Sequence, residues 1–353
     1  MKKILLLLFL LCPLKIFAIS ASSYIVMDLD SGRVLEGKNT QKVSLIASTT
    51  KILTAITAIE YGNLEEVVTV NEDILSSYGS GIYIQVGEQL TLDDLLYGLI
   101  LRSGNDAALA IASHVGGSVD NFVYLMNEVA LKIGMKDSSF VNPSGLEEQD
   151  GSANLSTTYD MALLTKYAME NEHYKRITST KEIIVKSNYK TYKWRNKNKL
   201  LHSYSYCDGG KTGYTKKAHR TLVTTANKDN MKLVVVTFND GNDFNDHKVL
   251  YEKYFNNYER VKVLDTNDYY GKNVVLKNNF YIIKNDKDKV ETRVTNYSTK
   301  AAVNGSIVGK IEVLLNGEIL GHRNLYYKKN SVTKNNSFLD KLMNILLFFE
   351  RNK

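Results

Sequence analysis

Residues Ala47–Ala55 read ASTTKILTA and place Ser48 and Lys51 three positions apart at the start of an apolar run. Residues at this spacing share one face of a helix. One interpretation is an ordinary helix that begins with a serine cap and carries a surface lysine. The other is a nucleophilic hydroxyl beside its own base, since a lysine removed from water can lose its proton near neutral pH. The segment alone allows both interpretations, because the same spacing recurs at Ser187–Lys190 and Ser331–Lys334.

Two short motifs further along the chain favour the nucleophile. RSGNDAA contains Ser103 and Asn105 at the start of an expected helix, and DGGKTGYT contains Lys211-Thr212-Gly213 beside the expected strand HRTLVTTAN. Each motif is weak alone, since Ser103 would otherwise be a helix cap and Lys211 a solvated turn residue. Together with the serine–lysine pair, and in this order, they form the signature of penicillin-binding proteins and class A β-lactamases.

Over about residues 22–257 the chain resembles the low-molecular-mass penicillin-binding proteins that are serine D-alanyl-D-alanine carboxypeptidases. The resemblance is carried by YIVMDLDSGRVLEGKN, ASTTKILTA, LLYGLILRSGNDAALAIASHVGGS, FVNPSGL and GGKTGYTKKAHRTLVTTANKD. YKWRNKNKLL and DGNDFNDHK are most similar to a Gram-positive branch that includes spore-cortex enzymes. The resemblance implies an enzyme that removes the terminal D-alanine from peptidoglycan stem pentapeptides, is inhibited by β-lactams and needs no cofactor.

The resemblance also implies a catalytic role for each motif residue. Ser48 attacks the carbonyl carbon between the two D-alanines and forms an acyl-enzyme, while Lys51 takes the proton from Ser48. Ser103 relays a proton to the leaving amine, and Asn105 holds the peptide amide. Lys211 supplies positive charge to the site.

The substrate-binding residues implied by the resemblance follow Lys211 on the same strand. Thr212 binds the terminal carboxylate, and Gly213 leaves room for the substrate against the strand edge. Tyr214 and Ser48 supply the two backbone N–H groups of an oxyanion hole. Some relatives bind the carboxylate with an arginine after the last sheet strand, but FNDGNDFNDHK has none. Lys211 and Thr212 must then bind the carboxylate without that arginine, or Arg220 contributes to its binding.

The sequence lacks the patterns that would indicate nucleic-acid binding, a metal site or a cofactor. The formal charge of +7 comes from 45 Lys+Arg against 38 Asp+Glu, without a basic block that would indicate nucleic-acid binding. The six histidines show no metal-ligand spacing, and Cys207 would be the only cysteine left after export. Motifs for phosphate, dinucleotide or zinc-protease sites are absent from the sequence. We therefore expect no metal, no cofactor and no nucleic-acid partner.

The pattern along the chain predicts an α/β (α+β) fold. Residues 63–170 have mostly helical spacing, strand patterns lie near 219–239, and the chain is β-rich from about Val261, with a hairpin turn at Asn316-Gly317. With the resemblance, this predicts a penicillin-binding/β-lactamase-like serine acyltransferase domain with an antiparallel sheet, a helical subdomain and a small C-terminal β domain. The expected division of the chain is a signal peptide at 1–20, the catalytic domain at 21–260, the β domain at 261–330 and an amphipathic tail helix at 331–353.

Both ends of the chain predict an exported protein at the membrane surface. Residues 1–20 read MKKILLLLFLLCPLKIFAIS, which has the charged, apolar and small-residue regions of a secretory signal peptide. Phe338–Phe349 reads FLDKLMNILLFF. As a helix it would span about 18 Å, too short for roughly 30 Å of hydrocarbon, so we expect it to lie in the membrane interface. The alternative is a tail that packs on the β domain as an ordinary amphipathic helix. The expected location is the outer face of the cytoplasmic membrane and the cell wall.

Two alternative functions stay open at this point. A β-lactamase-like hydrolase would turn over penicillin quickly, whereas a carboxypeptidase of this kind would be trapped by it. NPSGLEEQDGS contains Glu147 and Glu148, but the sequence does not place either as a base that activates water. A non-catalytic penicillin-binding wall protein would lack a catalytic residue, and the three motifs are intact.

Overall fold

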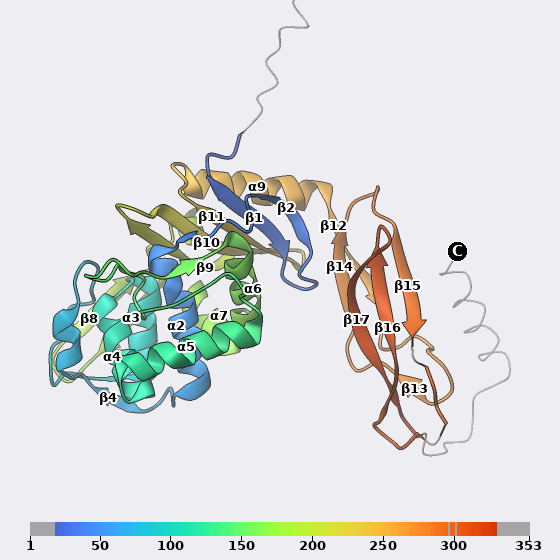
Figure 1. The fold of residues 1–353 in the computed structure, drawn as a ribbon, viewed down its shortest axis with the longest axis horizontal. Helices are drawn as coiled ribbons and strands as arrows, with labels where there is room; N and C mark the ends of the chain where they lie inside the picture. Colours follow the sequence, from blue (N-terminus) through green and yellow to red (C-terminus); the bar gives the residue numbers. More distant parts are fainter. Residues whose placement is uncertain (1–17, 296, 301, 330–353) are drawn as a thin grey trace, which may run out of the picture.

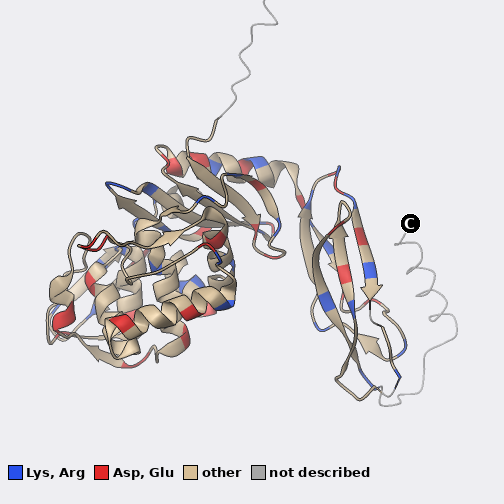
Figure 2. Ribbon diagram, viewed as in Figure 1, with Lys and Arg blue, Asp and Glu red and all other residues tan. Residues whose placement is uncertain are grey.

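The computed structural model describes residues 18–329 except 296 and 301. Residues 1–17 of the predicted signal peptide and the whole predicted tail helix, 331–353, lie outside the described residues. The described chain forms a larger part up to α9 and a separate β part from β12 onwards (Figure 1). Figure 2 shows acidic and basic residues interspersed over both parts.

A five-stranded antiparallel sheet is the frame of the larger part, in the order β2-β1-β11-β10-β9. The first strand of the chain pairs with a strand near the end of this part, with Tyr24 opposite Thr237. β9 lies at the edge of this sheet, which leaves one side of the strand open to other elements. The strands are β1 (Ser23–Asp28), β2 (Val34–Lys38), β9 (Cys207–Thr215), β10 (His219–Lys228) and β11 (Met231–Phe238).

Helices cover both faces of this sheet. On one face, α9 (Asp243–Asn257) packs with Tyr251 and Phe255 against strand residues such as Val26 and Val235. The other face carries a larger set of helices, which continues beyond the sheet as a helical subdomain (Figure 1). These helices are α2 (Lys51–Tyr61), α3 (Leu92–Leu101), α4 (Asn105–Gly116), α5 (Val119–Ile133), α6 (Thr158–Ala168) and α7 (Glu172–Ser179). The short helix α8 (Lys199–Ser203) lies on the α9 face, where Leu200 and Leu201 are buried in the same core as Tyr251.

Short elements connect these helices. η2 (Ala47–Thr50) and η3 (Glu72–Ser76) are single 3-10 turns. Three two-stranded ribbons complete the larger part: β3 (Ser44–Leu45) with β6 (Leu155–Ser156), β4 (Val67–Thr69) with β5 (Gln89–Thr91), and β7 (Glu182–Lys186) with β8 (Thr191–Arg195).

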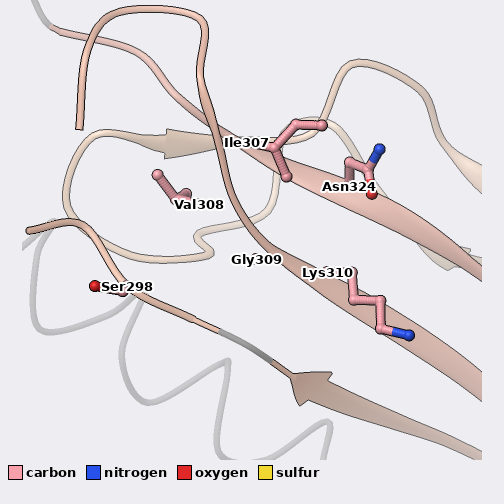
Figure 3. Close-up of a pocket in the computed structure, with 6 residues that line it drawn as sticks. All are labelled: Ser298, Ile307, Val308, Gly309, Lys310 and Asn324. Atoms are coloured by element: carbon pink, nitrogen blue, oxygen red, sulfur yellow. The ribbon is translucent and has the colours of Figure 1, made fainter.

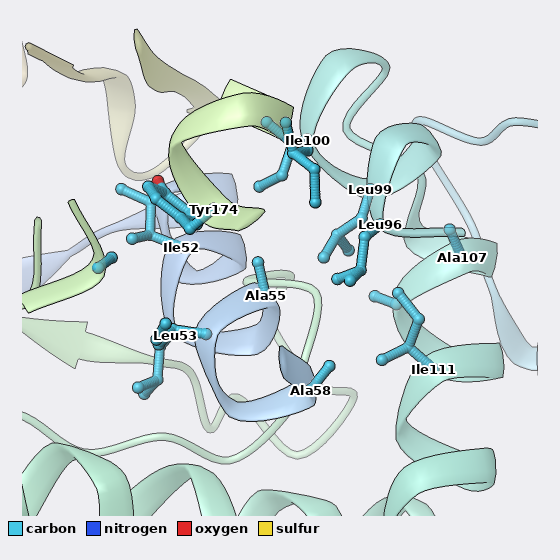
Figure 4. Packing of buried hydrophobic residues seen from close by; sticks show 14 of the residues in the cluster. Ile52, Leu53, Ala55, Ala58, Leu96, Leu99, Ile100, Ala107, Ile111 and Tyr174 are labelled. Atoms are coloured by element: carbon cyan, nitrogen blue, oxygen red, sulfur yellow. The ribbon is translucent and has the colours of Figure 1, made fainter. Parts of the chain in front are cut away.

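α2 runs through the middle of the helical side, and residues 51–58 of it are all buried. Figure 4 shows its side chains Ile52, Leu53 and Ala55 enclosed by residues of α3, α4 and α7, among them Ile100 and Tyr174. A helix that is buried all round has a fixed position, because every direction of movement meets packed side chains. The first residue of this helix, Lys51, is therefore held in place by the core.

The C-terminal part is all β and has its own apolar core, which includes Ile282, Val313 and Leu325. Asn316 and Gly317 both have positive φ at the turn between β16 and β17, so the predicted hairpin is confirmed. The strands are β12 (Glu259–Leu264), β13 (Val274–Val275), β14 (Phe280–Lys284), β15 (Val290–Thr295), β16 (Ile307–Leu315) and β17 (Glu318–Tyr327).

Ion pairs connect the two parts of the chain. Arg33 in the β1–β2 turn pairs with Asp288 at 2.7 Å, and Arg260 pairs with Asp30 at 2.7 Å. Within the described residues, none of the helices combines the length and the apolar character needed to cross a membrane.

Candidate active site

The serine–lysine motif lies at the entry to the buried helix. Ser48 is partly exposed in the 3-10 turn η2, and Lys51 is the first residue of α2 and is fully buried. The interpretation of Lys51 as a surface lysine is therefore wrong. Ser48 is also not a helix cap, because the cap positions of η2 and α2 are Ile46 and Thr50.

Lys51 makes three polar contacts inside the protein. Its Nζ lies 3.1 Å from Ser48 Oγ and donates to Asn105 Oδ1 at 2.7 Å and to the backbone oxygen of Ser144. Burial, helped by the nearby cation Lys197 and opposed by the carboxylate of Asp106, lowers the pKa of Lys51 to about 7. A lysine with this pKa is partly neutral at physiological pH and can accept a proton from the serine beside it.

The second motif joins α3 to α4. Ser103 is buried in the turn with φ +62, and Asn105 is the first residue of α4. Asn105 Nδ2 donates to the backbone oxygen of Tyr78 at 2.6 Å, and the carboxylate of Asp106 accepts the backbone N–H groups of residues 82–84. These bonds hold residues 78–84 against the motif, so the neighbourhood of Asn105 is fixed.

The third motif lies on the edge strand β9. Lys211 is buried, in contrast to the interpretation as a solvated turn residue, and its Nζ donates to Ser103 Oγ at 3.0 Å and to the Thr212 backbone oxygen at 2.7 Å. Burial holds its pKa well below 10.5, and the cations Lys51 and Lys197 lower it further. The Lys211 amine therefore loses its proton more readily than the amine of a solvated lysine, and an anion beside it would favour its protonated form.

Gly213 lets β9 approach η2 closely. A Cβ at this position would lie 3.0 Å from the backbone N of Ser48 and 2.3 Å from Thr221 Oγ1. Only glycine fits there without displacing the serine backbone. Tyr214, the next residue, is largely exposed at the same edge.

The fold thus brings together the motif residues that the sequence singled out. Hydrogen bonds connect Ser48, Lys51 and Asn105, and separately Ser103 and Lys211, while Gly213 lies against the backbone of Ser48. Arg220, the alternative contact for a substrate carboxylate, has its guanidinium paired with Asp243.

Sequence reasoning missed the role of the loop that contains NPSGL. The side-chain oxygen of Asn142 accepts the N–H of Gly145 at 2.8 Å, and this turn directs the carbonyl of Ser144 toward Lys51. Gly145 has φ +82, and a Cβ there would lie 2.0 Å from the backbone oxygen of Ala47. Gly145 was the available signal for this tight turn in the sequence. The acceptor itself is the backbone oxygen of Ser144, which the identity of the residue does not reveal.

Two other hollows in the described structure lie away from these residues. One, of about 400 Å³, is in the C-terminal part and has Lys310 as its only ionisable side chain (Figure 3). The other, of about 440 Å³, lies at the N-terminal end of β9, beside Asp208 and Lys232. Neither is lined by a motif residue, and the described residues contain no group of side chains suited to a metal ion.

Comparisons with known proteins point to one group of enzymes. Residues 13–242 match the family described as D-alanyl-D-alanine carboxypeptidase, and residues 254–333 match the C-terminal domain of penicillin-binding protein 5. D-alanyl-D-alanine carboxypeptidase DacF of Bacillus subtilis is 36% identical over 224 residues, which are 62% of this chain and 57% of that protein. DacA of Haemophilus influenzae is 31% identical over 342 residues, 87% of this chain and 84% of that protein.

Solved structures agree with these matches. A D-alanyl-D-alanine carboxypeptidase from Mycobacterium tuberculosis has a TM-score of 0.64 at 30% identity, over 69% of this chain and 95% of that chain. Penicillin-binding protein 5 from Haemophilus influenzae has a TM-score of 0.73 at 26% identity, over 89% of this chain and 98% of that chain. The predicted fold class, an antiparallel sheet with helices and a C-terminal β domain, is confirmed.

Proposed function

The chain belongs to the D-alanyl-D-alanine carboxypeptidase family, and from this premise we propose that it removes the terminal D-alanine from peptidoglycan pentapeptide stems through an acyl-enzyme on Ser48. It is a serine-type carboxypeptidase of the penicillin-binding kind. The observation that carries the choice of Ser48 is the buried amine of Lys51 at 3.1 Å from its hydroxyl, with a pKa lowered to about 7.

In the proposed acylation step, Ser48 Oγ attacks the carbonyl carbon between the two D-alanines as its proton passes to Lys51 Nζ. The oxyanion is bound by the backbone N–H groups of Ser48 and Tyr214. Loss of one donor of this kind costs on the order of 3 kcal/mol of transition-state stabilisation. The close approach of Gly213 to the Ser48 backbone supports this arrangement, because it brings β9 alongside η2.

The remaining motif residues act on the two ends of the leaving D-alanine. Ser103, hydrogen-bonded to Lys211, relays a proton to the leaving amine as the C–N bond breaks, while Asn105 holds the amide of the acyl part. Lys211 and Thr212 bind the terminal carboxylate, since the Arg220 guanidinium is held by Asp243. Water then hydrolyses the ester on Ser48 and releases the shortened stem.

The two glutamates near the site favour a carboxypeptidase over a β-lactamase. The Glu147 carboxylate accepts from Thr215 Oγ1 at 3.2 Å and pairs with Lys217 at 2.6 Å, and Glu148 accepts from Asn142 Nδ2 at 2.6 Å. Both carboxylates are thus engaged by other groups. We expect a β-lactam to stay bound to Ser48, because its ester has no dedicated base to activate water.

The test is release of D-alanine from a pentapeptide that ends in D-Ala-D-Ala, together with labelling by a fluorescent penicillin. Ser48→Ala should abolish both while the thermal unfolding temperature stays close to that of the unaltered protein. Ser187→Ala is the matched control, because Ser187 also has a lysine three positions on, and it should keep both activities. Stoichiometric labelling of Ser48→Ala would refute the assignment.

We also propose that the protein is exported and held at the outer face of the cytoplasmic membrane by residues 331–353. The support is the sequence: a signal-peptide pattern at one end and the apolar segment Phe338–Phe349 with flanking lysines at the other. Each basic residue near an anionic surface contributes on the order of 1 kcal/mol to membrane attraction.

A further inference from the structure

The edge strand β9 continues past the proposed catalytic residues, and the ion pair of Glu147 with Lys217 lies beside its C-terminal end. We propose that Glu147 and Lys217 form a subsite for the side chain that precedes the two D-alanines, and that this subsite selects a side chain ending in both an ammonium and a carboxylate. The inference rests on the function proposed above and extends it to the choice of stem peptide.

The direction of the substrate follows from the proposed contacts. The terminal carboxylate of the substrate binds at Thr212, and the scissile carbonyl binds at the N–H of Tyr214. Followed from its carboxylate back toward its N-terminus, the substrate therefore runs toward the C-terminal end of β9. An extended chain advances by about 3.3 Å per residue, and an open strand edge can take such a peptide alongside it. The residue before D-Ala-D-Ala therefore reaches Thr215 and the turn that follows.

Glu147 lies at this end of β9 and is bound to it by its side chain. One carboxylate oxygen accepts from Thr215 Oγ1 at 3.2 Å, and the other pairs with Lys217 Nζ at 2.6 Å. The Glu147 side chain is 21% exposed and the Lys217 side chain 68% exposed. The carboxylate is thus held in place, whereas the ammonium can move to meet a ligand.

Hydrogen bonds also fix Glu147 relative to the catalytic residues. Tyr78 Oη donates to the backbone oxygen of Glu147 at 2.6 Å, and the backbone oxygen of Tyr78 accepts from Asn105 Nδ2 at 2.6 Å. Glu147 also belongs to the loop whose Ser144 carbonyl contacts Lys51. The Glu147 carboxylate is therefore held at a fixed position relative to Ser48, where it can interact with a charged group of the bound substrate.

The two charges match a side chain that carries the opposite pair. A substrate ammonium can pair with Glu147 while a substrate carboxylate takes Lys217, so that every charge keeps a partner. A side chain that ends in an ammonium alone competes with Lys217 for Glu147 and leaves one cation unpaired. The residues next to this pair in the sequence are also charged: Lys216 is exposed, and the Glu148 carboxylate accepts from Asn142.

The test compares two pentapeptides that differ only in the third residue, which is either lysine or 2,6-diaminopimelate. We expect the unaltered protein to cleave the diaminopimelate peptide with a kcat/KM about fivefold higher, the size of effect expected from an exposed ion pair. Lys217→Ala should lower kcat/KM for the diaminopimelate peptide but not for the lysine peptide, whose ammonium no longer competes for Glu147, and should bring the ratio close to one. Glu147→Gln should lower kcat/KM for both peptides.

Lys216→Ala, which removes the neighbouring exposed charge, is the matched control and should keep the preference. The rate of Ser48 acylation by benzylpenicillin, which lacks this side chain, measures the catalytic groups separately in each variant. Equal cleavage of the two peptides by the unaltered protein, or an unchanged ratio in Lys217→Ala, would overturn the subsite and leave the carboxypeptidase assignment intact. Acylation by benzylpenicillin without D-alanine release from either peptide would overturn the proposed function, and the subsite with it.

Discussion

Lys51 Nζ lies 3.1 Å from Ser48 Oγ, and its other two polar contacts, Asn105 Oδ1 and the Ser144 backbone oxygen, can only accept hydrogen bonds. A neutral amine has two N–H groups and one lone pair. The two acceptors use both N–H groups, so the lone pair is left for the Ser48 hydroxyl. The surroundings of Lys51 therefore orient its amine as a base as well as lowering its pKa.

This arrangement predicts how acylation depends on pH. With a pKa of about 7, Lys51 is protonated and inactive in acid and neutral in base. The rate of Ser48 acylation by benzylpenicillin should rise about tenfold per pH unit below this pKa and level off above it. Lys51→Ala should reduce the rate by several orders of magnitude. A variant that keeps a tenth of the rate, or a rate that falls between pH values of about 6 and 8, would contradict the role of Lys51.

Lys197 provides a control for the same profile. Its positive charge is one of the causes that lower the pKa of Lys51. Lys197→Met should therefore raise that pKa and move the midpoint of the acylation profile to higher pH, with the plateau retained. A midpoint that moves down would show that Lys197 does not act through its charge.

Lys211 should take up a proton when the substrate carboxylate binds. Burial and the cations Lys51 and Lys197 hold its pKa well below 10.5, and an anion beside it would raise that pKa. Calorimetric titration of Ser48→Ala with an acylated D-Ala-D-Ala dipeptide, in two buffers of different ionisation enthalpy, measures the protons bound. The dipeptide should bind with a larger proton uptake than the dipeptide amide, which has no carboxylate. Equal values for the two ligands would contradict this prediction.

Gly145 should tolerate alanine far less than Gly151 does. Both glycines have φ above +80, but a Cβ on Gly145 would lie 2.0 Å from the Ala47 backbone oxygen, whereas Gly151 has open space. Gly151→Ala should cost only the left-handed strain, about 1 kcal/mol of unfolding free energy. Gly145→Ala should cost about 3 kcal/mol or more, and it should slow acylation because the Ser144 carbonyl moves. Urea unfolding and benzylpenicillin acylation of the two variants test this, and equal losses would contradict it.

His247 should make the protein less stable in acid. The ring is buried between Thr224 and Thr237, and burial lowers its pKa to about 3. The unfolded chain takes up a proton below a pH of about 6.5, which the folded protein resists. The stability that depends on neutral His247 is thus complete above that pH and is lost as the pH falls toward 3, by about 1.4 kcal/mol per pH unit.

The unfolding free energy of His247→Gln, measured between pH values of about 6.5 and 4, should therefore fall less steeply than that of the unaltered protein. His173→Gln, at an exposed position, is the control and should keep the original slope. Identical slopes in all three proteins would show that His247 does not resist protonation.

Removal of residues 331–353 should change location and leave the chemistry in place. Soluble D-Ala-D-Ala cleavage should stay nearly unchanged, because the motif residues all belong to the larger part of the chain. The protein should move from the membrane fraction to the soluble fraction, as shown by sedimentation. A truncated protein that unfolds, or that still sediments with membranes, would refute the anchor.

Features that depend on neighbours along the chain could be predicted from the amino-acid sequence. The spacing of Ser48 and Lys51, the Lys211-Thr212-Gly213 motif and the Asn316-Gly317 turn are local patterns, so each could be recognised before the fold was considered. Helical spacing also predicted the helices within residues 63–170, and strand and turn patterns predicted the β-rich end. Local spacing decides which side chains share a face of a helix or strand, and this much does not require the tertiary structure.

The surroundings of each of these groups could not be predicted in this way, because they form only in the packed chain. Lys51 meets Asn105, 54 residues away, and the Ser144 carbonyl, 93 residues away, and these contacts exclude water from its amine. Its lowered pKa is a consequence of that burial, and no local pattern distinguishes it from Lys190 at the same spacing after Ser187. The pairing of Glu147 with Lys217, 70 positions further along, is of the same kind. Desolvation and contacts between distant segments arise only when the chain packs, because the free energy of a charge depends on everything around it.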